Sequence, residues 1–274
     1  MNLFDDTLMS RVEDAGLNAS APPQQRWLDG WLVRYLPGKA RRARCINALA
    51  AGRLPLARKL ALAAPVYAAA GLPMIFRLTA FTQPAGLDEE LAAQGYGVVD
   101  PTRVMILPTL PTRPAATIAA HGPTGVPVCV SAGLPVGLHW VALDSLPFAQ
   151  TVGALRGSPP DHITSHALRL AHSPVPYQGF ALRRDSDGMT LACGQLAQEG
   201  EMVGLYDVFT HESVRGQGLS SQLCERMLAI AASQGAKLAY LQVDAENQPA
   251  LKVYRRLGFV DAYRYHYRER QTQV

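Results

Sequence analysis

A glycine-rich turn between an apolar run and a periodic helix is the feature that most constrains this chain. The apolar run covers residues 202–209, and the turn covers residues 214–221, VRGQGLSS. From Leu219 onward, apolar residues recur every four positions, which predicts a helix. A strand, a glycine turn and a helix N-terminus present backbone N–H groups to an anion, and glycine lets a phosphate approach closely. Arg215 adds a fixed positive charge at this loop. The segment therefore predicts an α/β fold with a phosphate-binding loop.

A second segment continues this alternation of strand and helix. Residues 237–243 are dense in large apolar residues and predict a strand. Asn247 suits the N-cap of a following helix, and Pro249 suits its first turn. Gly258 suits the position just after that helix. The loop at 214–221 lacks both the Gly-Lys-Ser/Thr ending of nucleotide triphosphatases and the third glycine of dinucleotide-binding turns, so neither of those classes is indicated.

Together the two segments resemble the GNAT superfamily of N-acetyltransferases. Residues 215–220 are similar to its acetyl-CoA signature, Gln/Arg-x-x-Gly-x-Gly/Ala, with serine at the last small position. Its second motif, Asn-x-x-Ala-x-x-x-Tyr-x-x-x-Gly-Phe, is matched by Asn247, Ala250, Tyr254, Leu257, Gly258 and Phe259. The resemblance covers residues 125–270 well and the first hundred only faintly. It implies an α/β (α+β) fold, a mixed twisted β-sheet flanked by helices, and acetyl-CoA as the cosubstrate.

The resemblance also implies where acetyl-CoA binds. Its pyrophosphate is expected on the loop, and its pantetheine arm on the backbone of the preceding strand, if that strand is splayed as in the superfamily. Backbone groups of Phe209 and Thr210 would contact the oxyanion, and Asn247 would hold the pantetheine arm or an ordered water. The full set is Val208, Phe209, Thr210, Arg215, Gly216, Gln217, Gly218, Leu219, Ser220, Ser221, Asn247 and Tyr254.

Acetyl transfer to an amine also needs proton transfer. An alkyl ammonium has a pKa of about 10, so a base or a water-mediated path must first remove a proton. Asp207 is the candidate base, with Glu201, His211 and Glu246 as rivals and a satisfied polar residue in the sheet as the structural alternative. Tyr254 is implied as the acid, because the superfamily places this tyrosine beside the thioester sulfur. From the residues alone, a core aromatic on the apolar face of the helix is the favoured interpretation.

Two further patterns admit a functional and a structural interpretation. His162 and His166 are spaced to share one helix face, but no third ligand lies nearby, so we predict no metal site. In the superfamily this helical region borders the acceptor site, which keeps a substrate contact open. Residues 263–268 alternate tyrosines with Arg264, His266 and Arg268. One face of that strand could contact the substrate, or the tyrosines could pack on the core while the basic face meets solvent.

The order of elements suggests two similar halves. Before a Pro-, Thr- and Ala-rich stretch, strands are expected at 30–36, 42–49, 72–79 and 102–107, with helices at 55–70 and 87–94. Gly52 falls opposite Gly216, but Leu91 stands where Tyr254 stands, so the first half has lost the cofactor motifs. We predict a degenerate GNAT-like domain at 1–110, a linker at 111–127 and a GNAT acetyltransferase domain at 128–274.

Composition limits the other classes of function. A chain with 48% hydrophobic and 18% charged residues can bury a core, and its net charge is only +4. Four scattered cysteines without a Cys-x-x-Cys pair argue against zinc and against a disulfide framework. Residues 1–20 lack the pattern of a signal peptide, and no run reaches the length of a membrane helix. We expect a cytoplasmic protein without nucleic-acid or membrane partners. The cluster Lys39, Arg41, Arg42 and Arg44 leaves nucleic-acid binding as a minor alternative.

The sequence therefore predicts an acetyl-CoA-dependent N-acetyltransferase. It would pass the acetyl group directly to a primary amine of a small molecule or peptide, without a covalent enzyme intermediate. Tandem arrangements of this kind occur in mycothiol synthase-like enzymes, so the amine of a thiol-cofactor precursor is one candidate acceptor. The alternative is a non-catalytic acyl-CoA sensor or interaction module, which would bind the cofactor without turnover.

Overall fold

The computed structural model describes residues 4–110 and 134–270, so the predicted linker at 111–127 lies outside the described residues. The described part of the chain divides into two compact units. Unit 1 contains residues up to 104 together with 243–248 and the segment that begins at 261. Unit 2 contains residues 105–242 and 249–260. The domain boundaries expected from the sequence stay a prediction, and each unit is described by itself.

Unit 1 combines the N-terminal third of the chain with the last strand. Its elements are α1 (Asp6–Ala19), β1 (Gln25–Leu28), β2 (Trp31–Arg34), a 3-10 turn (Arg41–Ala43), β3 (Ile46–Ala48), α2 (Leu56–Ala69), β4 (Ile75–Leu78), α3 (Leu87–Ala93), β5 (Tyr96–Leu107) and β11 (Val260–Arg270). The strand order is β1-β2-β3-β4-β11-β5. β3 and β4 are parallel, whereas β11 runs antiparallel to β4 with His266 opposite Leu78.

The helices expected at 55–70 and 87–94 are confirmed as α2 and α3, and a strand overlaps each expected strand range, although β5 begins at Tyr96 rather than at 102. Two elements were missed, because the sequence analysis identified nothing before residue 30. α1 begins where the carboxylate of Asp5 accepts a hydrogen bond from the backbone N–H of Leu8 at 2.7 Å, a side-chain N-cap. β1 is a short strand with a largely exposed face, so it carries little apolar signal.

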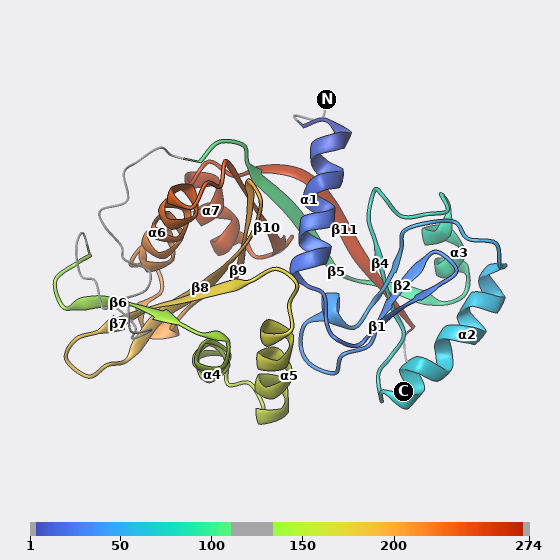
Figure 1. Cartoon of the computed structure of the whole chain (residues 1–274), viewed down its shortest axis with the longest axis horizontal. Helices are drawn as coiled ribbons and strands as arrows, with labels where there is room; N and C mark the ends of the chain where they lie inside the picture. The colour runs from blue at the N-terminus through green and yellow to red at the C-terminus, as the bar shows by residue number, and fades with distance from the viewer. Residues whose placement is uncertain (1–3, 111–133, 271–274) are drawn as a thin grey trace. The chain divides into compact units, whose positions relative to one another are not determined.

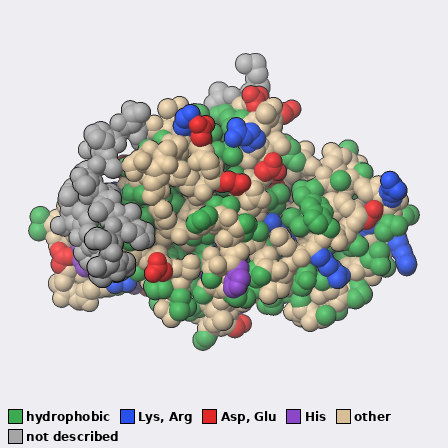
Figure 2. Space-filling view, in the orientation of Figure 1, with side chains coloured by type: hydrophobic (Ala, Val, Ile, Leu, Met, Phe, Trp, Pro, Cys, Tyr) green, Lys and Arg blue, Asp and Glu red, His purple; other side chains and the backbone are tan. Residues whose placement is uncertain are grey.

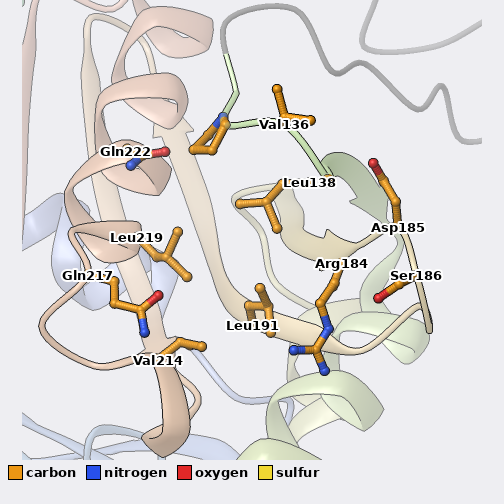
Figure 3. A pocket seen from close by; sticks show the side chains of 12 residues that line it. Val136, Leu138, Arg184, Asp185, Ser186, Leu191, Val214, Gln217, Leu219 and Gln222 are labelled. Atoms are coloured by element: carbon orange, nitrogen blue, oxygen red, sulfur yellow. The ribbon is translucent and has the colours of Figure 1, made fainter.

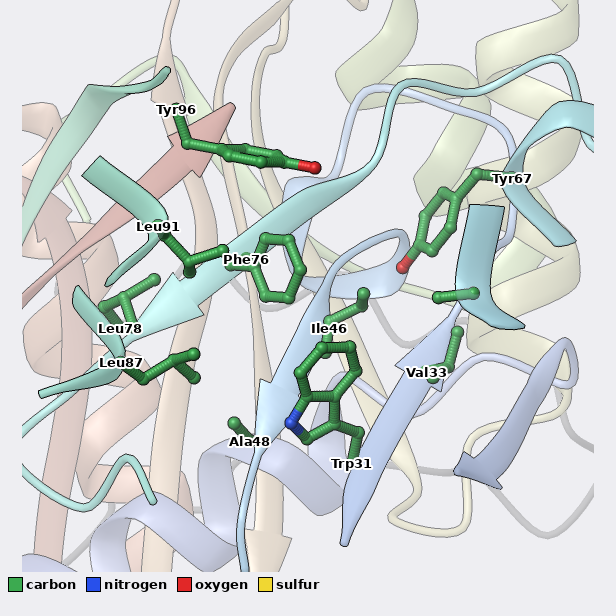
Figure 4. Close-up of a cluster of buried hydrophobic side chains, with 11 residues drawn as sticks. Trp31, Val33, Ile46, Ala48, Tyr67, Phe76, Leu78, Leu87, Leu91 and Tyr96 are labelled. Carbon is green, nitrogen blue, oxygen red and sulfur yellow. The ribbon is translucent and has the colours of Figure 1, made fainter. Parts of the chain in front are cut away.

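A cluster of aromatic and aliphatic side chains forms the core of unit 1 (Figure 4). The fully buried Trp31 packs edge to face on Phe76, with ring centroids 5.3 Å apart. Phe76 packs in the same way on Tyr96, at 5.5 Å. Edge-to-face pairs of this kind add to the stabilisation that burial of the rings provides. The core thus joins β2, β4 and the start of β5.

The tyrosines of the C-terminal run pack inward, as the structural alternative predicts. Tyr263, Tyr265 and Tyr267 are buried in unit 1. On the other face of β11, His266 Nε2 and Arg268 Nε lie 3.1 and 2.6 Å from the Asp88 carboxylate. His266 and Arg268 therefore contact a carboxylate of the same unit.

Unit 2 contains the remaining elements. These are β6 (Leu138–Leu143), α4 (Ser145–Arg156), α5 (Pro160–Ala171), β7 (Tyr177–Arg184), β8 (Thr190–Glu199), β9 (Met202–Thr210), a 3-10 turn (Glu212–Val214), α6 (Leu219–Ser233), β10 (Leu238–Asp244) and α7 (Gln248–Arg256). The strand order is β10-β9-β8-β7-β6. β9 and β10 are parallel, and the other neighbours are antiparallel. The strands and helices expected at 202–209, 219 onward, 237–243 and 247–257 are confirmed.

Helices cover both faces of the unit 2 sheet (Figure 1). A side chain at Gly194 of β8 would meet Met227 and Leu223, so this face packs on α6. A side chain at Gly179 of β7 would meet Phe148, so the opposite face packs on α4. Mixed sheets with a helix layer on each face are the α/β arrangement expected from the sequence. The side chains of β9 therefore face α6 on one side of the sheet and α4 on the other.

No helix within residues 4–110 and 134–270 has both the length and the apolar character needed to cross a membrane. On the face drawn in Figure 2, acidic and basic side chains are scattered in small groups of both signs. Arg41, from the cluster considered for nucleic acid, forms ion pairs with Asp100 and Glu269 inside unit 1. Part of that positive charge is therefore neutralised within the protein.

Candidate functional site

The loop before α6 has the geometry of an anion site. Gly216 and Gly218 both have φ of +80°, a conformation that side chains disfavour and glycine adopts freely. Gly218 is the N-cap of α6 and brings no side chain to cover its first turn. No residue of the described ranges accepts a hydrogen bond from the backbone N–H groups of 216–221. These donors and the positive end of the helix are therefore available to a phosphate.

Arg215 lies against the end of β9. Its Nε is 3.4 Å from the carbonyl oxygen of Thr210, and its guanidinium lies 5.7 Å from the centre of the Phe209 ring. The structure thus brings Arg215 to Phe209 and Thr210, three of the residues that the resemblance assigned to the cofactor. The contacts join the charged end of the loop to the strand expected to hold the pantetheine arm.

The end of β9 leaves the ladder that it forms with β10. Pairing of these parallel strands runs from Met202 with Leu238 to Leu205 with Leu241, whereas β9 continues to Thr210. On its other edge, β9 stays paired with β8, where Thr210 lies opposite Ala192. In the described ranges, residues 208–210 consequently have no pairing partner in β10, and the Thr210 carbonyl oxygen contacts Arg215 Nε. This is the arrangement that the predicted splay required.

A bulge in β9 changes the direction of one carboxylate. The β8–β9 register passes from Cys193 opposite Phe209 to Gln195 opposite Tyr206, so β9 carries one extra residue there. Asp207 lies within the bulge and has φ of +51°. Aspartate is among the few non-glycine residues that tolerate this conformation. The bulge therefore aims a charged side chain that regular pairing would place differently.

Asp207 has three polar partners from other elements. Its Oδ1 accepts a hydrogen bond from Arg156 Nη1 at 2.8 Å, and its Oδ2 accepts one from Gln195 Nε2 at 2.7 Å. His166 Nε2 lies 3.3 Å from Oδ2. Burial works against the charged carboxylate, but the charge of Arg156 and the contact from His166 hold the pKa of Asp207 well below its usual range. Sequence reasoning found Asp207 but missed Arg156 and Gln195, which carry no local motif.

The rival base candidates have other contacts. Glu201 forms an ion pair with Lys237, and both side chains are more than half exposed. His211 Nδ1 lies 2.8 Å from Ser213 Oγ and caps the short 3-10 turn after β9. Glu246 lies in the turn before α7, in the part of the chain that belongs to unit 1. None of these three candidates is among the polar partners of Asp207 given above.

Tyr254 faces the interior of unit 2. Its side chain lies on α7, is 9% exposed and packs on Phe259 with ring centroids 6.0 Å apart. Burial raises the pKa of Tyr254, and the nearby Cys224 of α6 acts in the same direction. The phenol is protonated at neutral pH, and the raised pKa makes it a weaker proton donor than a free tyrosine. Asn247 precedes α7, where its backbone N–H donates to the Asp244 carbonyl, and its expected contact with pantetheine stays a prediction.

The turn ahead of α2, which the sequence analysis predicts to correspond to this loop, is filled by a carboxylate of unit 1. Asp29 accepts hydrogen bonds from the backbone N–H groups of Arg53 and Leu54 at 2.8–2.9 Å. Lys59 Nζ lies 3.2 Å from the same carboxylate. A Cβ on Gly52 would come within 2.2 Å of the Asp29 carbonyl oxygen. The donors ahead of α2 are thus occupied, unlike those ahead of α6.

Beside the loop of unit 2 lies a cavity of about 760 Å³ (Figure 3). Gln217 and Gln222 line it on the side of α6, and Leu138 and Arg184 line it on the side of the β6–β7 hairpin. The Arg184 guanidinium is held by Asp187 at 2.6 Å. In the described ranges, no three His, Cys, Asp or Glu side chains gather closely enough to hold a metal ion, and His162 and His166 are not joined by a third ligand.

Comparison with known proteins shows similarity to N-acetyltransferases. The family model described as acetyltransferase (GNAT) family matches residues 142–259. The uncharacterized N-acetyltransferase YobR of Bacillus subtilis is 25% identical over 247 residues, which is 89% of this chain and 91% of that protein. A mycothiol acetyltransferase of Clavibacter sepedonicus is 31% identical over 126 residues, 45% of this chain but only 39% of that enzyme. A GCN5-related N-acetyltransferase from Kribbella flavida has a similar fold, with a TM-score of 0.61, 18% identity and 96% of each chain covered.

Proposed function

Because residues 142–259 belong to the acetyltransferase (GNAT) family, we propose that this enzyme transfers the acetyl group of acetyl-CoA directly to a primary amine. The observation that carries the proposal is the open loop ahead of α6. It offers a row of backbone N–H donors, a helix N-terminus and Arg215 to one anion, next to a strand end with open backbone groups. A diphosphate joined to an extended amide-containing arm matches this combination.

In this proposal residues 215–221 bind the pyrophosphate, and the backbone of residues 208–210 binds the pantetheine arm. The amine nitrogen attacks the thioester carbonyl, and the C–N bond forms while the carbonyl oxygen gains negative charge. A backbone N–H at Phe209 or Thr210 stabilises that charge, because a fixed dipole in a dry site needs no reorganisation. The C–S bond then breaks, and Tyr254 donates its proton to the departing sulfur.

Direct transfer is favoured by the state of the nearby thiols. Burial raises the pKa of Cys193 and of Cys224 to about 12 in each case. A thiol rather than a thiolate is a poor nucleophile, so neither side chain is suited to carry the acetyl group at neutral pH. We therefore propose attack by the acceptor amine on acetyl-CoA itself.

The acceptor is proposed to be an amine of a small molecule or peptide. The partial similarity to a mycothiol acetyltransferase makes the amine of a thiol-cofactor precursor one candidate. The decisive experiment measures CoA release from acetyl-CoA with a thiol reagent across amino acids, polyamines, aminoglycosides, aminothiol conjugates and peptides. Amine-dependent release is the expected result. Tight acetyl-CoA binding without release for any acceptor would instead support the non-catalytic sensor.

Placing a carboxylate in the loop should abolish cofactor binding. Gly218→Asp adds a negative charge where the pyrophosphate is proposed to lie, and we expect the Kd for acetyl-CoA to rise by about 100-fold or more. Gly235→Asp is the matched control, because Gly235 follows the other end of α6 with φ of +92° and open space around its Cβ position. The control should bind as the wild type does in calorimetry. Equal losses in both variants would contradict the proposed pyrophosphate position.

A further inference from the structure

The polar cluster around Asp207 lies between the sheet of unit 2 and helices α4 and α5. Asp207 of β9 contacts Arg156 at the end of α4, His166 of α5 and Gln195 of β8. Phe209, two residues beyond Asp207, packs in the apolar cluster that these helices cover. The cluster therefore borders the strand end that is proposed to hold the thioester.

Asp207 by itself is poorly suited to remove a proton. Both carboxylate oxygens already accept hydrogen bonds, from Arg156 on one side and Gln195 on the other. A carboxylate stabilised in this way binds a proton weakly, and its lowered pKa has the same consequence. The contacts of Asp207 instead suit a residue that orients the side chains around it.

His166 is the neighbour that can titrate. Its Nε2 is buried, lies 3.3 Å from Asp207 Oδ2 and makes no aligned hydrogen bond within the described ranges. Such contacts are often long before the substrate binds. The ring also packs edge to face on Phe148, at 6.3 Å between centroids. Nδ1 makes no hydrogen bond to any residue in the described ranges, and 16% of the side chain remains exposed.

Several charged groups act on Asp207 together with this histidine. Arg156 comes from the end of α4, and Arg169 lies one turn along α5 from His166, while Cys193 of β8 belongs to the neighbouring apolar cluster. Only Asp207 is negative. When the 3.3 Å contact closes to a hydrogen bond, Asp207 accepts from Nε2–H, which fixes the tautomer and leaves Nδ1 to accept a proton.

We propose that His166 is the base of the reaction and that Asp207 is its positioning residue. This inference rests on the proposed function. Nδ1 takes one proton from the ammonium form of the acceptor, directly or through one water. The freed amine lone pair forms the C–N bond, the C–S bond breaks, and the sulfur takes the Tyr254 proton. The second proton on the attacking nitrogen leaves as the amide forms and restores the Tyr254 hydroxyl. His166 returns its proton to solvent, so that one amide, one CoA thiol and one proton are produced per turnover.

The test compares pH profiles of kcat at saturating acceptor for His166→Gln, Asp207→Asn and the wild type. A histidine base gives the wild type a limb that rises between about pH 5 and 8, below the range in which alkyl amines titrate. His166→Gln should lose this limb and lower kcat by about 100- to 1,000-fold. Asp207→Asn should keep the limb but lower kcat with little change in the KM for the amine, because the ring remains and loses only the carboxylate that orients it.

His162→Gln is the matched control, since it changes a histidine one turn earlier on the same helix and should leave the profile unchanged. Acetyl-CoA affinity, measured for every variant, reports whether the fold is intact. An unchanged limb in His166→Gln overturns the inference. So does a limb that Asp207→Asn loses while His166→Gln keeps it, which would make Asp207 the base. If Asp207→Asn does not fold, the two histidine variants decide. A wild type that binds acetyl-CoA but acetylates no amine overturns the proposed function itself.

Discussion

Replacing Glu13 with glutamine is expected to lower the free energy of unfolding by about 3–5 kcal/mol, the cost of breaking a buried ion pair from one side. Glu13 of α1 and Arg77 of β4 are both almost completely buried. Arg77 Nη2 donates to Glu13 Oε2 at 3.0 Å, its Nη1 contacts Oε1, and the Tyr263 hydroxyl donates to Oε2 at 2.7 Å. Glutamine keeps the volume but leaves the guanidinium buried without a counter-charge.

The contact between Glu13 and Arg77 also predicts that the stability of the protein falls at low pH. Burial alone would raise the pKa of Glu13, but the charge and hydrogen bonds of Arg77, with the Tyr263 hydrogen bond, hold it below the usual value of 4.5. A carboxylate whose pKa is lowered by folding stabilises the protein fully above its unfolded value. That contribution is lost as the pH falls below 4.5 and through the folded value. Wild type and Glu13→Gln should therefore converge in stability toward low pH.

Urea unfolding at pH 7 and at pH 3.5 measures both effects. Asp14→Asn is the control, because it removes the neighbouring carboxylate from an exposed position and should change stability by less than about 1 kcal/mol. The double variant Glu13→Leu with Arg77→Met removes both charges and should recover part of the loss. A single variant Glu13→Gln that is as stable as the wild type at pH 7 would show that the pair contributes no net stability.

Tyr254→Phe is expected to lower kcat by about 100-fold or more while the Kd for acetyl-CoA changes by less than about twofold. A missing general acid costs about this much, because the thiolate must then leave without a proton donor. The phenyl ring keeps its packing on Phe259, so binding and folding should be preserved. Stopped-flow or steady-state release of CoA gives kcat, and calorimetry gives the Kd.

Tyr240→Phe provides the control for the tyrosine substitution. Tyr240 is a second buried tyrosine of unit 2, and its hydroxyl lies 2.9 Å from the Tyr206 hydroxyl. Losing that hydrogen bond should cost about 1 kcal/mol of stability and leave kcat within a few-fold of the wild type. If Tyr254→Phe turns over as the wild type does, Tyr254 is a core aromatic and another group protonates the sulfur.

Sequence patterns predicted the elements whose signals are local. The helices α2, α3, α6 and α7 were expected from periodicity and caps, and the loop before α6 from its glycines. Elements with weaker patterns were missed: α1 follows an acidic N-terminus, and β1 exposes most of its four residues. The C-terminal strand was expected, but its neighbour was not, since β11 pairs with β4 of the first half.

The same division applies to the candidate site. Residues 215–221 and Tyr254 were identified because spacing along one helix or one turn suffices to define their geometry. Asp207 was identified only as a charged residue near the loop. Its partners Arg156 and Gln195 lie 51 and 12 positions away, and no motif links them. The bulge that turns Asp207 toward α4 and α5 depends on how β8 and β9 pair.

By itself, then, the sequence determined the glycine-rich loop, the helix that follows it and the position of the motif tyrosine. Backbone conformation at a glycine and apolar periodicity are set by neighbouring residues, so they can be inferred from adjacent positions. Only the tertiary structure decided which charges meet: Glu13 with Arg77 across 64 residues, and His166 with Asp207 across two elements of unit 2. A buried charge requires a partner, but chain topology rather than sequence spacing determines which partner it finds.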